Sequence, residues 1–379
     1  MHLFVIDLYI SIDTFAPIAD HLSGRKKKVL FFNSNVIQNH SSKNNLLLKY
    51  LKKNENFKML NNFKIYNFKF IFVNFLIYIF KFFLNLTKKK GYMFWRYLWQ
   101  QDFYLSNYYL NRIIKIFDIR SITILEDLPF KKKIFFKKIA KKNKIPFIMV
   151  PSGLSPLPGI TDISKEKPDF FLSPNLHNKG NIKDFESFKL VGSPRYASSW
   201  ISKLNKIYNI KKNPKDFNVG IFINPNENSL AEFNNIKKKL SEINIKSISN
   251  SKPREILPLD KTIQSTELSS TEIIEYSNVI IGYPSSILIE VILKNKPIIF
   301  PYYSEELIKL KKGSFFDGNE LFYFPKDFND LIKMVISFKD NKKSFEYDVI
   351  RKDLFLKSTI NFKKDNCILE NFDKFYDNL

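Results

Sequence analysis

Short runs of β-branched and aromatic residues alternate with longer segments of helical spacing along the chain. In the first half, the strand-like runs occupy residues 3–12, 29–32, 121–125, 146–150 and 169–172. Helical spacing covers 15–22 and the basic segment 132–142, and the aromatic-rich region 46–119 is predicted to be helical in large part. Because strands that alternate with helices pair in parallel, this half predicts a doubly wound α/β domain.

The second half repeats the alternation after a polar run at 211–216, which we take as the domain boundary. Strands are predicted at 219–223, 245–248, 278–281 and 297–300, and helices at 232–240, at 287–293 and from 327 onward. The expected organisation is a first domain over 1–210, a second over 211–345, and C-terminal helices over 346–379.

Loops that follow the predicted strands carry much of the candidate chemistry. In open parallel sheets these loops gather at the carboxyl ends of the strands, where ligands bind. Asp13 follows the first predicted strand, Glu126 and Asp127 follow the strand at 121–125, and Ser152 and Gly153 follow the strand at 146–150. We therefore expect a ligand cleft at this edge of the first sheet.

The segment 277–301 predicts a strand, a tight turn, a helix and a second strand. Gly282 and Pro284 mark the turn, and Ser285 and Ser286 stand at the expected helix start. A hydroxyl there caps one backbone N–H and leaves its neighbours for an anion such as phosphate. Glu290 returns to the face of Ser286 one turn later, within reach of a ribose attached to that phosphate. The alternatives are that Ser286 is an ordinary N-cap and Glu290 a solvated helix residue.

The pattern Gly-x-x-Ser-Ser-x-x-x-Glu over 282–290, followed by Lys-Pro-Ile-Ile-x-Pro over 296–301, resembles the donor-site region of GT-B glycosyltransferases. The resemblance implies that the serines hold the donor phosphate and that the glutamate holds the ribose. It also implies a GT-B-like fold, in which two Rossmann-like domains face each other across a cleft and the last helices, here 372–376, cross back onto the first domain. Ser193 and Arg195 lie in a Gly-Ser-Pro stretch that resembles the interdomain passage of these proteins.

A direct sugar transfer needs a base for the acceptor's proton and positive or N–H groups for the leaving phosphate. Glu126 and Asp127 resemble the acidic pair of bacterial sialyltransferase-like GT-B enzymes, although Leu128 follows where glycine is usual. Asp127 is the first choice for the base and Asp13 the second. The alternative for each is a carboxylate that caps the following helix.

Lys252 and Arg254 occupy the place where the sialyltransferase-like group, and the glycerophosphotransferases of teichoic acid synthesis, carry a His-Pro pair. Lysine can neutralise a phosphate, but it is not a neutral-range acid unless its pKa is strongly lowered. Arg254 could bind a phosphate through two hydrogen bonds. A solvated loop of charges is the alternative for both.

Composition narrows the chemistry further. The 379 residues are 44% hydrophobic, enough to fill two cores. The single cysteine, Cys367, excludes a disulfide framework, and the four histidines show no metal-ligand spacing. We therefore predict no metal site and no cofactor. The nucleotide-sugar itself is the expected co-substrate.

The formal charge of +24 suggests a polyanionic partner, although a general bias toward Lys, Asn, Ile and Phe contributes to it. No recognised motif supports specific nucleic-acid binding. The segment 68–86 is broken by polar residues and is too short in its apolar pieces to span a bilayer. An interfacial helix over 68–90, ending in three lysines, and a buried helix of the first domain are both open interpretations. The expected location is cytoplasmic, or peripheral at the inner face of the membrane.

These observations predict a metal-independent glycosyltransferase of bacterial surface-polysaccharide synthesis, such as capsule or lipopolysaccharide. It would move a sugar from a nucleotide-activated donor to a glycan or lipid-linked acceptor. The alternatives with the same architecture are a polyol-phosphate transferase of the CDP-glycerol type and a nucleotide-sugar 2-epimerase. A catalytically degenerate GT-B-like protein, or a polyanion-binding protein, is the non-enzymatic alternative.

Overall fold

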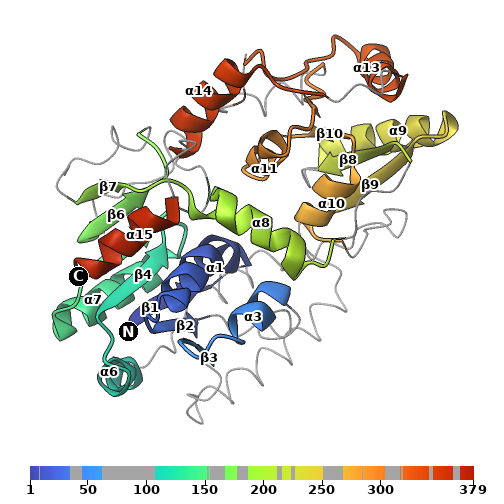
Figure 1. Ribbon diagram of the computed structural model, residues 1–379. Coiled ribbons are helices and arrows are strands. Elements are labelled where there is room, and N and C mark those ends of the chain that lie inside the picture. The colour runs from blue at the N-terminus through green and yellow to red at the C-terminus, as the bar shows by residue number, and fades with distance from the viewer. Residues whose placement is uncertain are drawn as a thin grey trace. The chain divides into compact units, whose positions relative to one another are not determined.

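Figure 1 shows the computed structural model of the chain, coloured from the N-terminus to the C-terminus. The structure describes residues 1–7, 9–34, 45–61, 107–151, 153, 167–176, 187–210, 216–222, 227–250, 268–283, 285–303, 316, 319–340, 345–361 and 368–379. The chain divides into two compact units. Unit 1 joins Met1–Ala197 to Asn366–Leu379, and unit 2 is Ser198–Asp365. The division therefore falls at 197/198, whereas the polar run pointed to 210/211.

Unit 1 is built on a parallel sheet, seven-stranded in the described residues, with the order β3-β2-β1-β4-β5-β6-β7. Its strands are β1 (His2–Ile6), β2 (Val29–Asn33), β3 (Phe57–Asn61), β4 (Ser121–Leu125), β5 (Phe147–Val150), β6 (Phe170–Ser173) and β7 (Phe188–Leu190). The chain winds outward in one direction from β1 and in the other from β4. This order confirms the doubly wound architecture, and it places the point where the winding reverses between β1 and β4.

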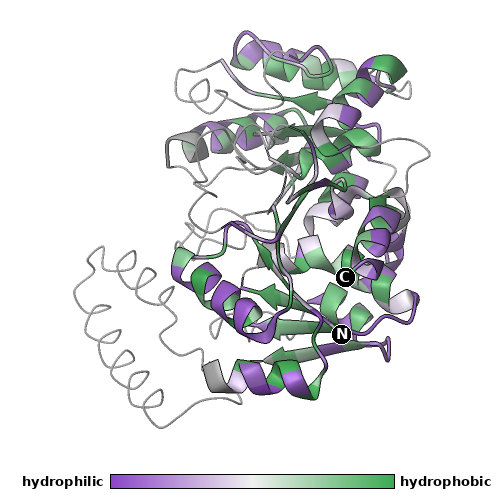
Figure 2. Ribbon diagram, turned by 90° about the vertical axis from the view of Figure 1, so that its left-hand side faces the viewer, coloured by the Kyte–Doolittle hydropathy of each residue, from purple (hydrophilic) through white to green (hydrophobic). Residues whose placement is uncertain are grey.

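Alternate residues of these strands point to a core beneath helices α6 (Asn107–Ile116) and α7 (Phe130–Asn143). This core contains aliphatic side chains from the inner strands, among them Val5 and Ile124, and the helix residues Ile113 and Phe136. All four are at most 3% exposed. Figure 2 shows the strands in green beneath helices that carry hydrophilic, purple bands. Burial of this one face per helix is what holds α6 and α7 on the sheet.

The other face of the sheet is covered by α1 (Tyr9–Gly24), α3 (Leu46–Leu51) and α15 (Ile368–Asp377). Its core is aromatic: Phe4 lies 5.2 Å from Phe15 and 5.7 Å from Tyr376, measured between ring centroids. The prediction of a strand over 3–12 is wrong beyond Ile6, because 9–12 already belong to α1. Apolar residues at Ile12, Phe15 and the following turns continue at helical spacing, and nearly every residue from 11 to 23 of this helix is buried.

Helix α15, from the C-terminal end of the chain, is an integral part of unit 1. Figure 1 shows it beside α1. The Asp373 carboxylate, 6% exposed, forms ion pairs with Arg25 at 2.9 Å and with Lys27 at 2.5 Å. The Tyr376 hydroxyl lies 2.8 Å from the Thr123 hydroxyl on β4. These contacts secure α15 to the turn between α1 and β2 and to strand β4.

Unit 2 contains a parallel sheet of order β11-β10-β8-β9 among the described residues. The strands are β8 (Asn218–Phe222), β9 (Lys246–Asn250), β10 (Val279–Gly282) and β11 (Ile298–Ile299), and the helices are α8 (Ser198–Ile207), α9 (Glu227–Glu242), α10 (Ser270–Tyr276), α11 (Leu288–Leu293), α13 (Phe328–Asp340) and α14 (Val349–Ile360). The winding reverses between β8 and β10. The prediction of a second Rossmann-like sheet is thus confirmed.

Lys296, just before β11, stabilises the C-terminal end of α10. Its ammonium group donates hydrogen bonds to the carbonyl oxygens of Ile274, Glu275 and Ser277, the last two at 2.7 and 2.6 Å. The final carbonyls of a helix have no partner within the helix, so a lysine at this position supplies the missing donors. Burial lowers the pKa of Lys296 to about 8. The Lys-Pro-Ile-Ile stretch therefore has a structural role within unit 2.

Candidate functional site

The turn predicted to hold the donor lies at the point where the winding of the unit 2 sheet reverses. Gly282 ends β10 and pairs with Phe222 at the end of the neighbouring β8. The chain then passes through Tyr283 and Ser285 into α11. In open parallel sheets, ligands bind outside the carboxyl ends of the strands on either side of such a reversal. The position is therefore the one in unit 2 where this architecture favours a ligand.

The geometry of this turn differs from the expected helix start. Helix α11 begins at Leu288, and its N-cap is Ile287, without a capping hydrogen bond from a side chain. The carbonyl oxygens of Ser285 and Ser286 accept hydrogen bonds from the N–H groups of Leu288 and Ile289, at 3.0 and 3.2 Å. The prediction that a serine hydroxyl caps the helix is wrong, because a tight turn separates the serines from the helix. Ser285 and Ser286 are both partly exposed on that turn.

Glu290 lies on the buried face of α11 and is 2% exposed. Its carboxylate oxygen Oε2 accepts a hydrogen bond from the Thr271 hydroxyl of α10 at 3.4 Å. The alternative of a solvated glutamate is therefore wrong. Burying a carboxylate carries a considerable desolvation cost, and this one lies in the first turn of the helix that follows the donor turn. Contact with a ribose remains a prediction.

Four of the residues predicted for the site lie outside the described residues. These are Pro284 of the donor turn, Lys252 and Arg254 of the proposed phosphate contacts, and Ser152 of the cleft loops. Their roles stay as predicted from the sequence.

The acidic pair after β4 lies at the reversal of the unit 1 sheet, between β1 and β4. The Glu126 N–H donates to the Val150 carbonyl at 2.9 Å, and the residue is 4% exposed. Asp127 follows on an exposed turn. Helix α7 has Pro129 as its N-cap, without a side-chain cap. The helix-capping alternative for Asp127 is therefore wrong, and Asp127 is the carboxylate of the pair that solvent or a substrate can reach.

Asp13 lies inside helix α1, and not in a loop after the first strand. The loop prediction fails because α1 starts four residues before it. The Asp13 carboxylate is 38% exposed and lies 3.9 Å from the Arg195 guanidinium. Arg195, in the short helix η4 (Pro194–Tyr196), also stacks over the Tyr196 ring, 5.8 Å from its centroid. The structure thus joins two of the predicted residues, although neither was expected to be the other's partner.

Three of the predicted cleft-loop residues meet at the carboxyl ends of β5 and β6. Gly153, Ser193 and Arg195 line one small cavity with Thr14 of α1 and Pro174. The cavity has a volume of about 10 Å³, near the minimum that holds a single water. The residues are therefore together, and the space that they enclose fits a water but not a sugar.

Solved structures similar to this chain include UDP-GlcNAc 2-epimerase from Methanocaldococcus jannaschii, the wall teichoic acid polymerase TagF with CDPG, and the glycotransferase of kitacinnamycin. The epimerase has a TM-score of 0.51 and 13% identity, and the alignment covers 91% of this chain and 94% of that one. TagF has a TM-score of 0.52 and 11% identity, and the alignment covers 99% of this chain and 88% of that one. The glycotransferase has a TM-score of 0.54 and 10% identity, and the alignment covers 100% of this chain and 99% of that one. No family model matches the sequence, and no curated protein matches it significantly. The chain has the GT-B fold.

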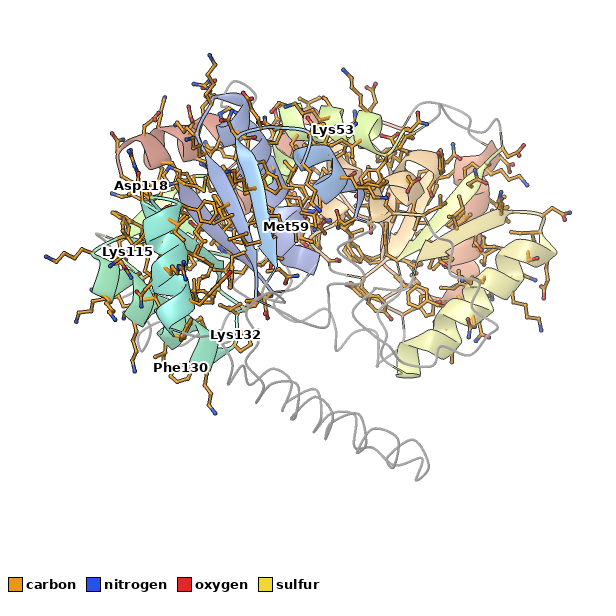
Figure 3. All side chains as sticks on the ribbon, turned by 90° about the horizontal axis from the view of Figure 1, so that it is seen from below. Lys53, Met59, Lys115, Asp118, Phe130 and Lys132 are labelled. Atoms are coloured by element: carbon orange, nitrogen blue, oxygen red, sulfur yellow. The ribbon has the colours of Figure 1, made fainter. Side chains whose placement is uncertain are left out.

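In this GT-B chain, sequence reasoning missed a buried cluster at the reversal of the unit 1 sheet. Lys132 of α7, 3% exposed, forms an ion pair and hydrogen bond with the Asp7 carboxylate directly after β1. The Ser34 hydroxyl, after β2, donates to the same carboxylate oxygen at 2.8 Å. Figure 3 labels Lys132 near the start of α7. The signal was present, because Lys132 stands one turn before the core residue Phe136 and therefore on the buried face of α7.

Among the described residues, no His, Cys, Asp and Glu side chains form a group of three or more that could hold a metal ion. No helix in the described ranges is long and apolar enough to cross a membrane. The segment 68–90, which was considered for interfacial contact, falls outside the described part of the chain.

Proposed function

We propose that this protein is a glycosyltransferase that takes its sugar from a nucleotide-activated donor. The observation that carries the proposal is the position of the turn after β10, at the reversal of the unit 2 sheet, with a buried glutamate in the first turn of the helix that follows. In the proposed complex the donor phosphate meets the turn at Ser285 and Ser286, and Glu290 accepts a hydrogen bond from a ribose hydroxyl. Gly282 and Pro284 shape the turn, and Lys252 and Arg254 neutralise the leaving phosphate.

The acceptor side of the reaction is assigned to unit 1. Asp127 removes the proton of the acceptor hydroxyl, because it is the exposed carboxylate at the reversal of that sheet. Glu126 and Asp13 are the second choices: the first is buried, and the second is paired with Arg195. We further propose a surface-polysaccharide or lipid-linked glycan as the acceptor, at the cytoplasmic face of the membrane, with contact through 68–90. No metal or cofactor is assigned a part in this reaction.

The first experiment tests the donor site by thermal unfolding against CMP, CDP, UDP, GDP and dTDP. A nucleotide present at about 100 times its dissociation constant adds about 2.7 kcal/mol to the free energy of unfolding. One nucleotide is expected to raise the melting temperature of the native protein. Glu290→Gln replaces the charged acceptor of the ribose hydroxyl by a weaker, neutral amide oxygen and is expected to reduce that shift.

Thr271→Val is the matched control for Glu290→Gln. Both substitutions disturb the hydrogen bond between the two side chains, so both are expected to lower the melting temperature without ligand. Only Glu290→Gln should also weaken nucleotide binding. If both variants bind the nucleotide equally well, Glu290 serves α10 alone and the ribose assignment is wrong. If no nucleotide shifts the native protein, the proposed function itself fails.

A second experiment tests the base and identifies the reaction. Asp127→Asn should lower the turnover rate by roughly 10²- to 10⁴-fold and leave donor binding unchanged. Asp13→Asn should have a much smaller effect. Product analysis then separates the reactions that one fold can support. A phosphodiester-linked product would indicate polyol-phosphate transfer, and an isomerised donor formed without acceptor would indicate 2-epimerisation.

A further inference from the structure

Helix α7 presents a concentration of positive charge that the proposed reaction does not use. Seven of its 14 residues are lysine, at 131–133, 137, 138, 141 and 142, and it contains no acidic residue. Lys132 is buried against Asp7, and the other six lysines are partly or fully exposed. Lys144, immediately after the helix, adds another exposed charge.

The exposed face of α7 is not purely polar. At 100° per residue, the lysines surround a strip that holds Phe130 and Ile134, one turn apart. Phe130 is 52% exposed, and Ile134 is partly exposed. Figure 3 labels Phe130 at the beginning of the helix. A large apolar side chain surrounded by long cationic ones is typical of surfaces that contact a bilayer, because the ring enters the head-group layer while the lysines meet the lipid phosphates.

The neighbouring helix α6 extends the same surface. Asn143 of α7 donates a hydrogen bond to the Asn111 side chain of α6 at 2.6 Å. Arg112 and Lys115 of α6 are exposed, and Ile116 at its end is 63% exposed. Acidic groups near this surface lie beyond the helix ends, at Asp127 before α7 and at Asp118 after α6, where Asp118 lies 3.7 Å from Arg120.

We infer that the lysine face, defined as Phe130, Ile134 and the exposed lysines of α7, docks unit 1 on an anionic lipid surface. Charge complementarity is the first argument, because each lysine near an anionic leaflet contributes on the order of 1 kcal/mol, or about fivefold in partitioning. The chemistry of the face is the second argument. Lysine is a point charge without the forked geometry that suits bases, and a single exposed aromatic ring provides no platform for stacking successive bases. A lipid surface therefore fits better than a nucleic acid.

The test measures binding of the full-length protein to vesicles of equimolar phosphatidylcholine and phosphatidylglycerol, with pure phosphatidylcholine for comparison. Binding is expected for the anionic vesicles and should fall steeply as salt is raised. The triple variant Lys138→Gln, Lys141→Gln and Lys142→Gln should bind roughly 100-fold more weakly. Phe130→Ser should weaken binding severalfold and leave a weaker, still salt-dependent component.

The matched control is Lys206→Gln, Lys238→Gln and Lys246→Gln in unit 2, at three exposed positions with the same change in net charge. It should change vesicle binding by less than about threefold, since the proposal places the contact in unit 1. Melting curves verify that both triple variants fold. The inference is overturned if the native protein does not bind anionic vesicles, or if both triple variants lose vesicle binding equally. Binding to a DNA duplex is measured for comparison. The inference is also overturned if the α7 triple variant binds DNA more weakly but binds the vesicles as the native protein does. It does not depend on the nucleotide assay above, so the two proposals can fail separately.

Discussion

Lys296 offers a quantitative test of the interpretation of unit 2. At pH 7 its ammonium group, with a pKa of about 8, carries one proton for each of the three carbonyl oxygens of Ile274, Glu275 and Ser277. Lys296→Met keeps the length of the side chain and removes all three donors. Each buried carbonyl without a partner costs about 1–3 kcal/mol, less where water can replace the lysine, and less at Ile274, whose carbonyl also accepts from the Ser277 N–H at 3.4 Å. We therefore expect a loss of about 3 kcal/mol in the free energy of unfolding.

Urea denaturation, with circular dichroism as the probe, measures this loss directly. For a unit of this size, 3 kcal/mol corresponds to a decrease in melting temperature of about 6–12 °C. Lys333→Met, at an exposed position of α13, makes the same change in charge and should cost less than about 0.5 kcal/mol. A loss below about 1 kcal/mol for Lys296→Met, with an unchanged denaturant slope, would refute the reasoning, because the carbonyls would then be satisfied in another way.

Two further predictions concern stability. Burial lowers the pKa of His2 to about 4, whereas its ordinary value in the unfolded chain is about 6.5. As the pH falls from 6.5 to 4, a proton binds the unfolded chain but not the folded one. The free energy of unfolding should therefore decrease by about 3 kcal/mol over this range. His2→Phe should flatten this pH dependence in urea titrations, and an unchanged slope would contradict it. Gly220→Ala should cost roughly 1–3 kcal/mol, because its Cβ would lie 2.5 Å from the Ser277 hydroxyl and 2.6 Å from Ile280 Cδ1. Gly24→Ala, with no atom within 4 Å, is the control and should be nearly neutral in the same denaturation assay.

Most of the sheet architecture was predictable because the inner strands are buried on both sides. Such strands appear in the sequence as uninterrupted apolar runs, as in β4 and β10. The sequence did not predict the edge strands β3 and β7. An edge strand is not buried on both sides and so does not require an uninterrupted apolar run. In β7, all three residues are partly or fully exposed. The first strand was predicted too long because Ile10, Ser11 and Ile12 alternate apolar and polar residues like a strand, although residues 9–12 belong to α1.

The candidate site was predictable in position and less so in geometry. Loops after strands lie at the same edge of a parallel sheet whatever their conformation, so the acidic pair and the donor turn could be placed from sequence. The start of α11 depends on two residues of turn geometry, which no pattern in Ser285 and Ser286 reveals. The pair of Lys132 and Asp7 joins positions far apart in the sequence. Lys132 stands in a run of lysines that otherwise face outward, so the sequence did not distinguish it from its exposed neighbours.

The place of α15 in unit 1 affects how the protein is made. Residues 198–365 are contiguous, so unit 2 has its entire chain available before unit 1 does. Within this sequence unit 1 starts before unit 2, yet the partners that α15 supplies to Arg25, Lys27 and Thr123 are translated after all of unit 2. Until then, the aromatic face around Phe4 has no Tyr376 to cover it. Unit 1 therefore starts before unit 2 and is completed after it, and its two parts are separated by the time needed to translate unit 2.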